Sequence, residues 1–268
     1  MGNFIAGIRL KLGFLLLASG LCAQASRELS LGPGIRMVYT DLLGNLYTLA
    51  YDHQVCQYDS QGKLRFRFAD NRMGRISALD VRDPLRILVF SADQQRLFTL
   101  DRTLSPLEEW PLQPEAWGQI SYAAMGKDQQ VWVYDMFNHQ LGSMTRTGEM
   151  VRQKTEFAGC CPRPPVISHI SLGRNRIFLY DTGQGIAECD LLGQFLRFIP
   201  LEPYERILTH GETSWVLYNK SGLEIGPDGK MREWEFPEGT HSIVGITDKS
   251  ILSWNETAGK VVVQDRKP

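Results

Sequence analysis

Three polar aromatic side chains are the main candidates for a ligand-binding cluster in this chain. Tyr39, Tyr122 and His169 occupy equivalent positions in three short apolar segments that recur along the sequence. If these segments pack around a common axis, two phenols and an imidazole meet there. They can then exchange hydrogen bonds with one another or with a bound small molecule. The alternative interpretation is a hydrogen-bonded cluster with a structural role only.

The sequence contains no motif that points to a reaction. It lacks a G-x-S-x-G turn, an H-E-x-x-H pair and a glycine-rich phosphate loop. Asp41 and Asp80 follow equivalent apolar segments and are interpreted as turn caps rather than calcium ligands. We therefore predict no catalytic residue, no metal site and no cofactor, and a protein that is not an enzyme.

The first 25 residues have the pattern of a secretory signal peptide. A positively charged start precedes the apolar run Leu12–Ala18, and an A-x-A site follows at 23–25. These features direct export and cleavage, whereas a stable membrane anchor needs ~20 apolar residues. We predict cleavage before Ser26 and export to the periplasm, with an uncleaved anchor or a lipid on Cys22 as alternatives. No later segment is apolar enough to span a membrane.

Four cysteines follow the predicted cleavage site: Cys56, Cys160, Cys161 and Cys189. An even number in an exported chain permits disulfides, and the sequence leaves their state open. Cys56 and Cys189 fall in predicted strands, where a free cysteine behaves as a small apolar residue. The adjacent pair Cys160-Cys161 lacks the spacing of a zinc motif.

The charge balance argues against one class of partner. The chain has 268 residues and a formal net charge of −1. A protein that binds nucleic acid or an anionic membrane surface usually presents an excess of Lys and Arg. We therefore predict that nucleic acid is not a partner.

A repeat of about forty residues organises the chain. Six short apolar segments contain equivalent positions spaced 42, 44, 46, 38 and 36 residues apart. A period of this length with several short strands in each repeat is the signature of a β-propeller. We predict an all-β, six-bladed propeller that forms a single domain over residues 26–268. The six segments are Leu46–Leu49, Ile87–Phe90, Val131–Tyr134, Ile177–Tyr180, Trp215–Tyr218 and Ile251–Trp254.

Each repeat is expected to supply four antiparallel strands, named A to D from the axis outwards. Strand B is nearly continuous in apolar residues, as expected where both faces are covered, and strand D alternates, as in Leu64–Phe68. The expected D strand Glu109–Leu112 contains Pro111, which suits an outer edge. The sixth repeat has no D strand, and the segment Arg27–Leu31 is spare. We predict that this N-terminal strand closes the last blade.

The segment Arg75–Phe90, followed by Leu100-Asp101-Arg102, carries a family resemblance. With the rest of the chain from residue 26 on, it resembles uncharacterised exported six-bladed propellers of Gram-negative, Bacteroidota-type envelopes, broadly NHL- and YncE-like. That family has no catalytic motif to transfer, so the resemblance implies only the fold and an envelope location. The chain departs from the pattern in lacking an NHL-type or WD signature in every blade.

The loops of the two faces differ in composition. In a propeller the D–A and B–C loops emerge on one face, here called the loop face, and the other loops on the opposite face. The loop-face residues belong to types enriched at protein interfaces, whereas the opposite loops read as ordinary solvated turns. We predict that they bind a protein partner; alternatively, the aromatic rings fill space beneath the loops. The residues are Tyr51, Arg72, Met73, Trp117, Phe137, Arg163 and Tyr204.

These observations favour a non-catalytic periplasmic propeller that acts as a protein-binding platform. Its partner would be a component of the cell envelope, and the protein would associate peripherally with an outer-membrane or secretion assembly. The alternative is a propeller enzyme, or a glycan- or small-ligand-binding protein, that uses the central channel and the cluster Tyr39, Tyr122 and His169.

Overall fold

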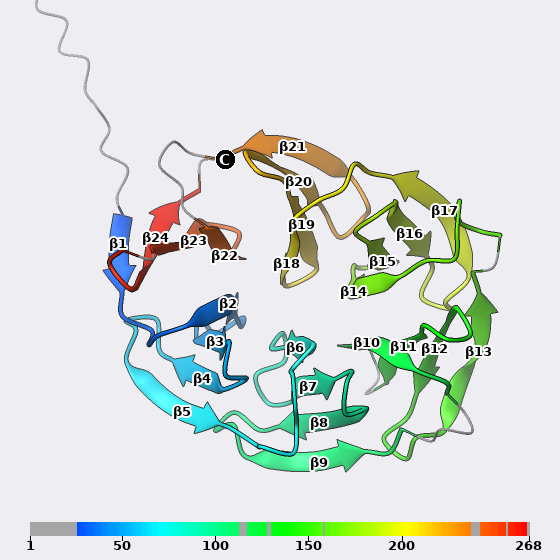
Figure 1. Ribbon diagram of the computed structural model, residues 1–268, viewed down its shortest axis with the longest axis horizontal. Helices are drawn as coiled ribbons and strands as arrows, with labels where there is room; N and C mark the ends of the chain where they lie inside the picture. Colours follow the sequence, from blue (N-terminus) through cyan, green and yellow to red (C-terminus); the bar gives the residue numbers. More distant parts are fainter. Residues whose placement is uncertain are drawn as a thin grey trace, which may run out of the picture.

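Six four-stranded antiparallel sheets surround a central axis (Figure 1). The computed structural model describes residues 26–112, 117–127, 130–157, 159–236, 242–255 and 257–266. The predicted signal peptide and Cys22 lie outside these residues. The described part of the chain has no helix of the length and hydrophobicity needed to cross a membrane. The prediction of an all-β, six-bladed propeller is confirmed.

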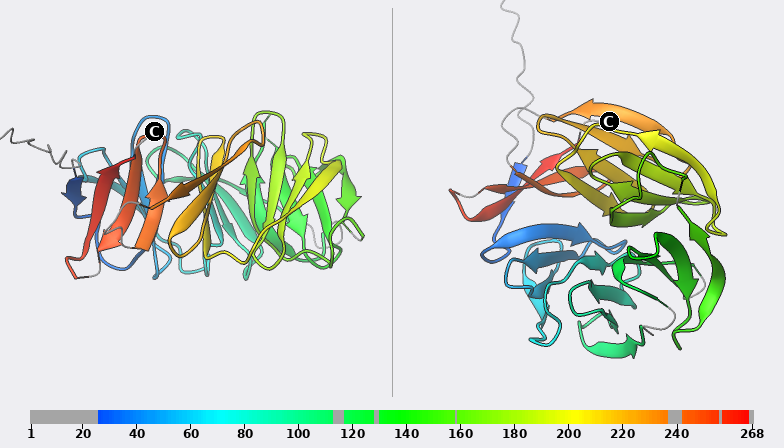
Figure 2. Two further views of the ribbon diagram at one scale, coloured as in Figure 1. Left: turned by 90° about the horizontal axis from the view of Figure 1, so that it is seen from above. Right: turned by 45° about the vertical axis from the view of Figure 1, so that its right-hand side comes forward.

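Each blade runs from an innermost strand A to an outermost strand D. Blade 1 consists of β2 (Ile35–Thr40), β3 (Leu46–Ala50), β4 (Val55–Tyr58) and β5 (Leu64–Phe68). Blade 2 consists of β6 (Ala78–Asp80), β7 (Ile87–Ser91), β8 (Arg96–Leu100) and β9 (Pro106–Trp110). Blade 3 consists of β10 (Ile120–Met125), β11 (Val131–Asp135), β12 (Gln140–Met144) and β13 (Met150–Glu156). Blade 4 consists of β14 (Ile167–Leu172), β15 (Ile177–Asp181), β16 (Gly185–Cys189) and β17 (Phe195–Pro200). Blade 5 consists of β18 (Arg206–His210), β19 (Thr213–Leu217), β20 (Ser221–Ile225) and β21 (Met231–Glu235). Blade 6 consists of β22 (Ser242–Ile246), β23 (Ser250–Asn255), β24 (Lys260–Asp265) and the N-terminal β1 (Ser26–Leu29). The strands cross the thickness of the ring, so their ends reach its two faces (Figure 2).

The N-terminal strand completes blade 6, as predicted. β1 pairs antiparallel with β24 in the register Ser26 to Gln264 and Leu29 to Val261, and the two lie side by side in Figure 1. Leu29 and the following Leu31 are buried in a core shared by blades 6 and 1. The Tyr58 hydroxyl of β4 donates to the carbonyl of Leu31. The chain therefore closes the ring with both hydrogen bonds and apolar packing.

The hydrophobic core lies between neighbouring blades. All residues of β7, β11 and β15 are buried, because adjacent blades cover both faces of each B strand. The positions of strands B agree with the predicted segments to within a few residues. One prediction is wrong: β9 ends at Trp110, so Pro111 lies outside the strand, and Pro106 begins it instead. Proline suits that first position because its missing N–H removes no ladder bond.

The described cysteines are free thiols, and Cys56 and Cys189 are buried in strands as predicted. Cys56 lies in β4 and Cys189 in β16, and neither is exposed by more than 6%. Cys160 and Cys161 are half-buried in the loop between blades 3 and 4. These cysteines therefore serve here as small packing residues and do not cross-link the blades.

Blade 6 holds its innermost strand close to blade 1. A side chain at Gly245 of β22 would place a Cβ 2.5 Å from the carbonyl oxygen of Val38 in β2, so glycine is required by this approach. Arg206 of β18 reaches past blade 6 and donates from Nη1 to the carbonyls of Ile243, at 3.0 Å, and Arg36, at 3.3 Å. Blades 5, 6 and 1 are therefore tied together at the axis by side chain and backbone.

Candidate functional site

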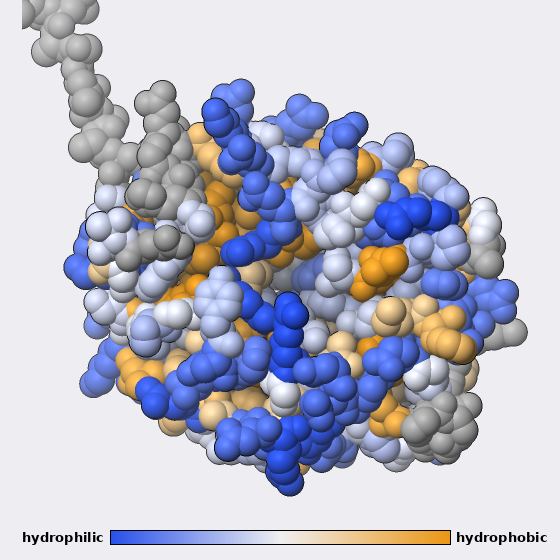
Figure 3. Space-filling model, viewed as in Figure 1, coloured by the Kyte–Doolittle hydropathy of each residue, from blue (hydrophilic) through white to orange (hydrophobic). Residues whose placement is uncertain are grey.

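A cavity of about 530 Å³ opens at the centre of the ring on the loop face. The first residues of the A strands and the loops that lead into them line it, because these strands run inward from this face. A hollow edged by hydrophilic residues is visible at the centre of the ring in the space-filling view (Figure 3). Its volume is typical of pockets that hold a small molecule or a few side chains. The lining includes Arg36, Tyr39, Arg75, Ser77, Asp93, Ser121, Tyr122, Ser168, His169, Tyr204, Glu205 and Arg206.

Tyr39, Tyr122 and His169 line this one cavity, as their equivalent positions indicated. The Tyr122 hydroxyl lies 2.7 Å from His169 Nδ1, and the two ring centroids are 4.8 Å apart. The ring of Tyr180 also packs against the imidazole, with the two ring centroids 5.6 Å apart. His169 Nε2 is buried and has no hydrogen-bond partner among the described residues. Whichever ring nitrogen carries the proton, this atom has an unused hydrogen-bonding site.

The aromatic cluster is uncharged near neutral pH. Burial lowers the pKa of His169 to about 3. Burial likewise raises the pKa of Tyr39 to about 12 and the pKa of Tyr122 well above its ordinary value. Charged forms of these groups are disfavoured because the surrounding blades replace water. The cluster can therefore accept or donate hydrogen bonds, but it offers no group with a pKa near 7 for proton transfer.

Three arginines that were not predicted from the sequence surround the cavity. Arg36 lies in β2, Arg75 precedes β6, and Arg206 begins β18. Arg36 Nη2 donates to the carbonyl of Ile76 at 2.7 Å. The signal was present in the sequence, since each arginine directly precedes an apolar residue at the start of an A segment. The three segments are far apart in the sequence, and only closure of the propeller ring places them around the opening of one cavity.

The far end of the channel is narrow and is lined by an ion pair. Arg82 Nε donates to Asp80 Oδ1 at 2.9 Å, and Arg82 Nη2 donates to the carbonyl of Met125 at 2.6 Å. Burial disfavours the charge of Asp80, but the adjacent Arg82 outweighs it and lowers the pKa of the carboxyl. A space of only about 20 Å³ remains at this end. The cavity is therefore accessible from the loop face.

Two buried carboxylates, also not predicted from the sequence, hold the loops of this face. Asp135 at the end of β11 accepts hydrogen bonds from the backbone N–H groups of Gly118, Gln119, Phe137 and Asn138 at 2.8 to 3.2 Å. It thereby joins a D–A loop to a B–C loop. Asp181 at the end of β15 does the same for Val166 and Gly183. An aspartate after strand B in two successive repeats was the available signal.

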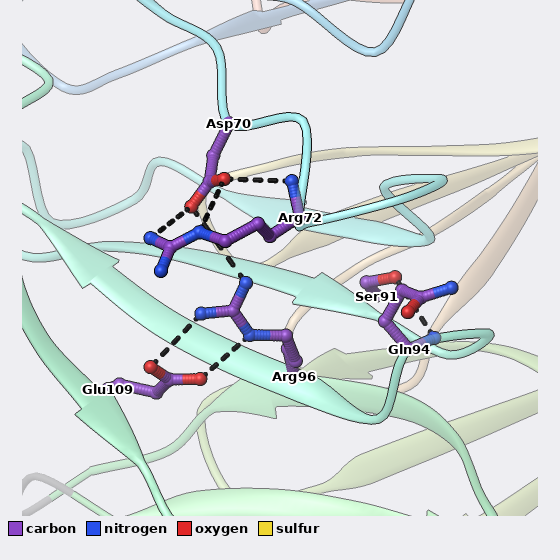
Figure 4. A network of polar contacts seen from close by, with 6 residues as sticks. All are labelled: Asp70, Arg72, Ser91, Gln94, Arg96 and Glu109. Carbon is purple, nitrogen blue, oxygen red and sulfur yellow. Dashed lines mark hydrogen bonds and ion pairs between the residues drawn. The ribbon is translucent and has the colours of Figure 1, made fainter.

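Four of the seven predicted partner-binding residues are exposed on the loop face. Tyr51 is 67% exposed and Phe137 is 77% exposed. Arg163 is exposed and lies 3.6 Å from Asp181. Arg72 is exposed beside Asp70, which in turn lies 3.8 Å from Arg96 (Figure 4). These side chains are available to a partner in their present positions.

The other three predicted contact residues are buried, so the prediction is wrong in their case. Met73 is 1%, Trp117 2% and Tyr204 8% exposed, and each packs into an inter-blade core. The physical reason is that D–A loops cross from the rim to the axis over the gap between two blades. A large apolar side chain on such a loop fills that gap, which was the alternative interpretation.

The opposite face is less polar than predicted. Leu42 and Leu43 in the first A–B loop and Leu85 in the second are exposed. Their loops are held by aspartate caps, since Asp41 accepts from the backbone of Leu43 and Asn45, and Asp80 caps its own turn. The capping role predicted for Asp41 and Asp80 is confirmed. Exposed apolar residues therefore occur on both faces, and the loop face differs by the cavity and by the exposed rings of Tyr51 and Phe137.

The described residues contain no group of three or more His, Cys, Asp or Glu side chains arranged to hold a metal ion. The combination of fold and cavity defines a propeller with a cation-lined axial pocket. No protein family and no curated protein matches the chain. Membership of the NHL- and YncE-like propellers therefore stays a prediction.

Similar structures have been solved. Streptogramin B lyase has a TM-score of 0.59 and 14% identity over 91% of this chain and 88% of that one. PorZ, an essential bacterial surface component of the type-IX secretion system of Porphyromonas gingivalis, has a TM-score of 0.60 and 8% identity over 87% of this chain and 32% of that one. The β-propeller domain of Cps50 (Swd1) from Myceliophteria thermophila has a TM-score of 0.58 and 12% identity over 87% of this chain and 83% of that one. At these identities the similarity shows the fold alone.

Proposed function

We propose that the protein is a non-catalytic binding protein of the cell envelope that holds a protein partner on its loop face. The observation that carries the proposal is the pair of exposed rings, Tyr51 and Phe137, on turns fixed by hydrogen bonds. Tyr51 N donates to the carbonyl of Gly34 at 2.9 Å, and Phe137 N donates to Asp135 at 3.0 Å. Rings presented on ordered backbone lose little entropy on binding.

The chemistry of the cavity favours binding over catalysis. The fold alone does not decide, because streptogramin B lyase is similar in structure. A general acid or base works best with a pKa near the working pH. The pKa of His169 is about 3 and that of Tyr39 about 12. Both groups instead suit the recognition of a bound polar group.

The proposed location rests on two observations. The N-terminal sequence has the charge, apolar core and cleavage site of an exported chain. The similar structure PorZ belongs to a bacterial surface secretion system. We infer a periplasmic protein that associates peripherally with an outer-membrane or secretion assembly.

Export predicts the N-terminus of the mature protein. Cleavage after Ala25 would leave the whole of β1 in place, because the first pair of that strand is Ser26 with Gln264. N-terminal sequencing of protein purified from the periplasmic fraction should begin at Ser26. A chain that begins at Met1, or at a lipid-modified Cys22, would contradict the predicted cleavage.

The loop face is tested by alanine variants in partner capture. Tyr51→Ala and Phe137→Ala should each weaken binding by about 1–3 kcal/mol if the rings are central anchors. Both rings are exposed, so the fold should tolerate the changes. The measurement is affinity capture from the native envelope, followed by titration of the co-purified partner.

Matched controls lie on the opposite face. Leu43→Ala and Leu85→Ala remove exposed apolar side chains of the A–B loops and should leave capture unchanged. Equal capture by all four variants would refute the loop-face assignment. A greater loss from the leucine pair would place the interface on the opposite face.

A further inference from the structure

We propose that the axial cavity is an anion-binding pocket in which Arg36, Arg75 and Arg206 receive a carboxylate of an acidic peptide segment. The proposal rests on the function proposed above and names the group that the partner inserts. Guanidinium groups bind carboxylates through paired, charge-assisted hydrogen bonds.

No carboxylate of the described residues forms an ion pair with any of the three arginines. Two carboxylates, Asp93 and Glu205, also line the cavity, which leaves an excess of one positive charge. The oxygens of Asp93 accept hydrogen bonds from Ser91 Oγ and from the backbone N–H groups of Arg75 and Gln94, rather than from a guanidinium group. An unpaired cation in a partly enclosed space favours an incoming anion.

Two of the guanidinium groups are held in place while most of their donors stay free. Arg36 uses Nη2 on the carbonyl of Ile76, and Arg206 uses Nη1 on the carbonyls of Ile243 and Arg36. Each guanidinium carries five N–H donors, so several remain unused. The Arg75 side chain makes no hydrogen bond to a described residue and is exposed at the opening of the cavity. Arg36 and Arg206 are therefore positioned in advance, and all three arginines keep free donors.

The electrostatics agree with this geometry. Burial lowers the pKa of Arg36, and the nearby charges of Arg75 and Arg206 lower it further. A bound carboxylate would relieve this repulsion.

The surroundings favour a peptide over a free ion. The cavity of about 530 Å³ is larger than an isolated carboxylate needs and accommodates an acidic side chain with part of its backbone. It opens on the face that carries the exposed rings of Tyr51 and Phe137, residue types that contact protein chains. An acidic segment of a partner would thus place its charge in the cavity and its flanking residues on the face.

The test is a calorimetric titration of the folded protein with an acetylated and amidated tetraglutamate peptide. Saturable binding that weakens with added salt is expected, and the tetraglutamine peptide should not bind. Arg75→Gln should weaken binding about tenfold, the effect of removing one charge-assisted hydrogen-bonding partner. Its side chain supports no described contact, so the variant should fold. Arg206→Gln should weaken binding as well, with circular dichroism to check the fold.

Arg102→Gln is the matched control, because it removes one exposed positive charge from a C–D loop of the opposite face. An equal loss of peptide affinity in this variant would show that the effect reflects net charge alone, and it would contradict a specific anion-binding pocket. Absence of tetraglutamate binding would also overturn it. Tighter binding of inorganic phosphate or of trigalacturonate would show that the anion bound in the cavity does not come from a peptide. Partner capture by Tyr51→Ala and Phe137→Ala is measured separately, so its result stands whatever the titration gives.

Discussion

Removal of residues 26–31 is expected to lower the melting temperature by about 10–20 °C or to cause aggregation. Leu29 and Leu31 are buried, and each buried leucine contributes about 1.5–3 kcal/mol. A domain of this size loses about 2–4 °C per kcal/mol. The deletion also exposes the hydrogen-bonding edge of β24, to which β1 pairs, and exposed edges promote association. Thermal unfolding and size-exclusion chromatography measure both effects.

Glu28→Ala is the control for the same strand. Glu28 pairs with Lys260 at 2.8 Å, and both side chains are about half exposed. An exposed pair contributes about 0–1 kcal/mol, so this variant should melt close to the unaltered protein. A truncated protein that melts unchanged as a monomer would show that β1 does not hold the ring closed.

Replacement of Asp135 by alanine is expected to cost on the order of 3 kcal/mol of unfolding free energy, because it leaves several buried N–H groups without an acceptor. The carboxylate is fully buried and accepts from four backbone N–H groups and from Asn138 Nδ2. Chemical denaturation measures the loss. Asp59→Ala, which removes an acceptor from a partly exposed C–D turn, should cost less. Equal costs would mean that the loop-face network is no more important than an ordinary turn cap.

The same network predicts a pH dependence. Burial opposes the charge of Asp135, but hydrogen bonds from Gly118 and Asn138 outweigh burial and lower its pKa below 3.8. A lowered folded-state pKa gives stability that is present above the unfolded pKa and lost as pH falls through the folded pKa. The difference in unfolding free energy between the unaltered protein and Asp135→Asn should therefore be constant above about pH 5 and shrink below pH 3.8. A difference that stays constant down to pH 2 would contradict the assigned charge.

The sequence by itself determined the architecture. The period of about forty residues, the apolar B segments and the spare Arg27–Leu31 segment predicted six blades and their closure, and the pairing of β1 with β24 confirms it. These features are readable because strand periodicity and repeat length are properties of neighbouring residues along the chain. Strand limits were less well determined, as β9 shows, because hydrogen-bond register depends on the adjacent strand.

The tertiary structure alone decided which residues form the site. Tyr122 and His169 are 47 positions apart, and Arg36 and Arg206 are 170 apart; each pair meets because ring closure brings different A strands to one axis. The same closure buried Trp117, Met73 and Tyr204 between blades while Phe137 and Tyr51 stayed outside. Both groups consist of large apolar or aromatic residues. Only the position of each loop relative to the gap between two blades decides whether its side chain is buried or exposed. That position depends on the packing of neighbouring repeats, which no single repeat encodes.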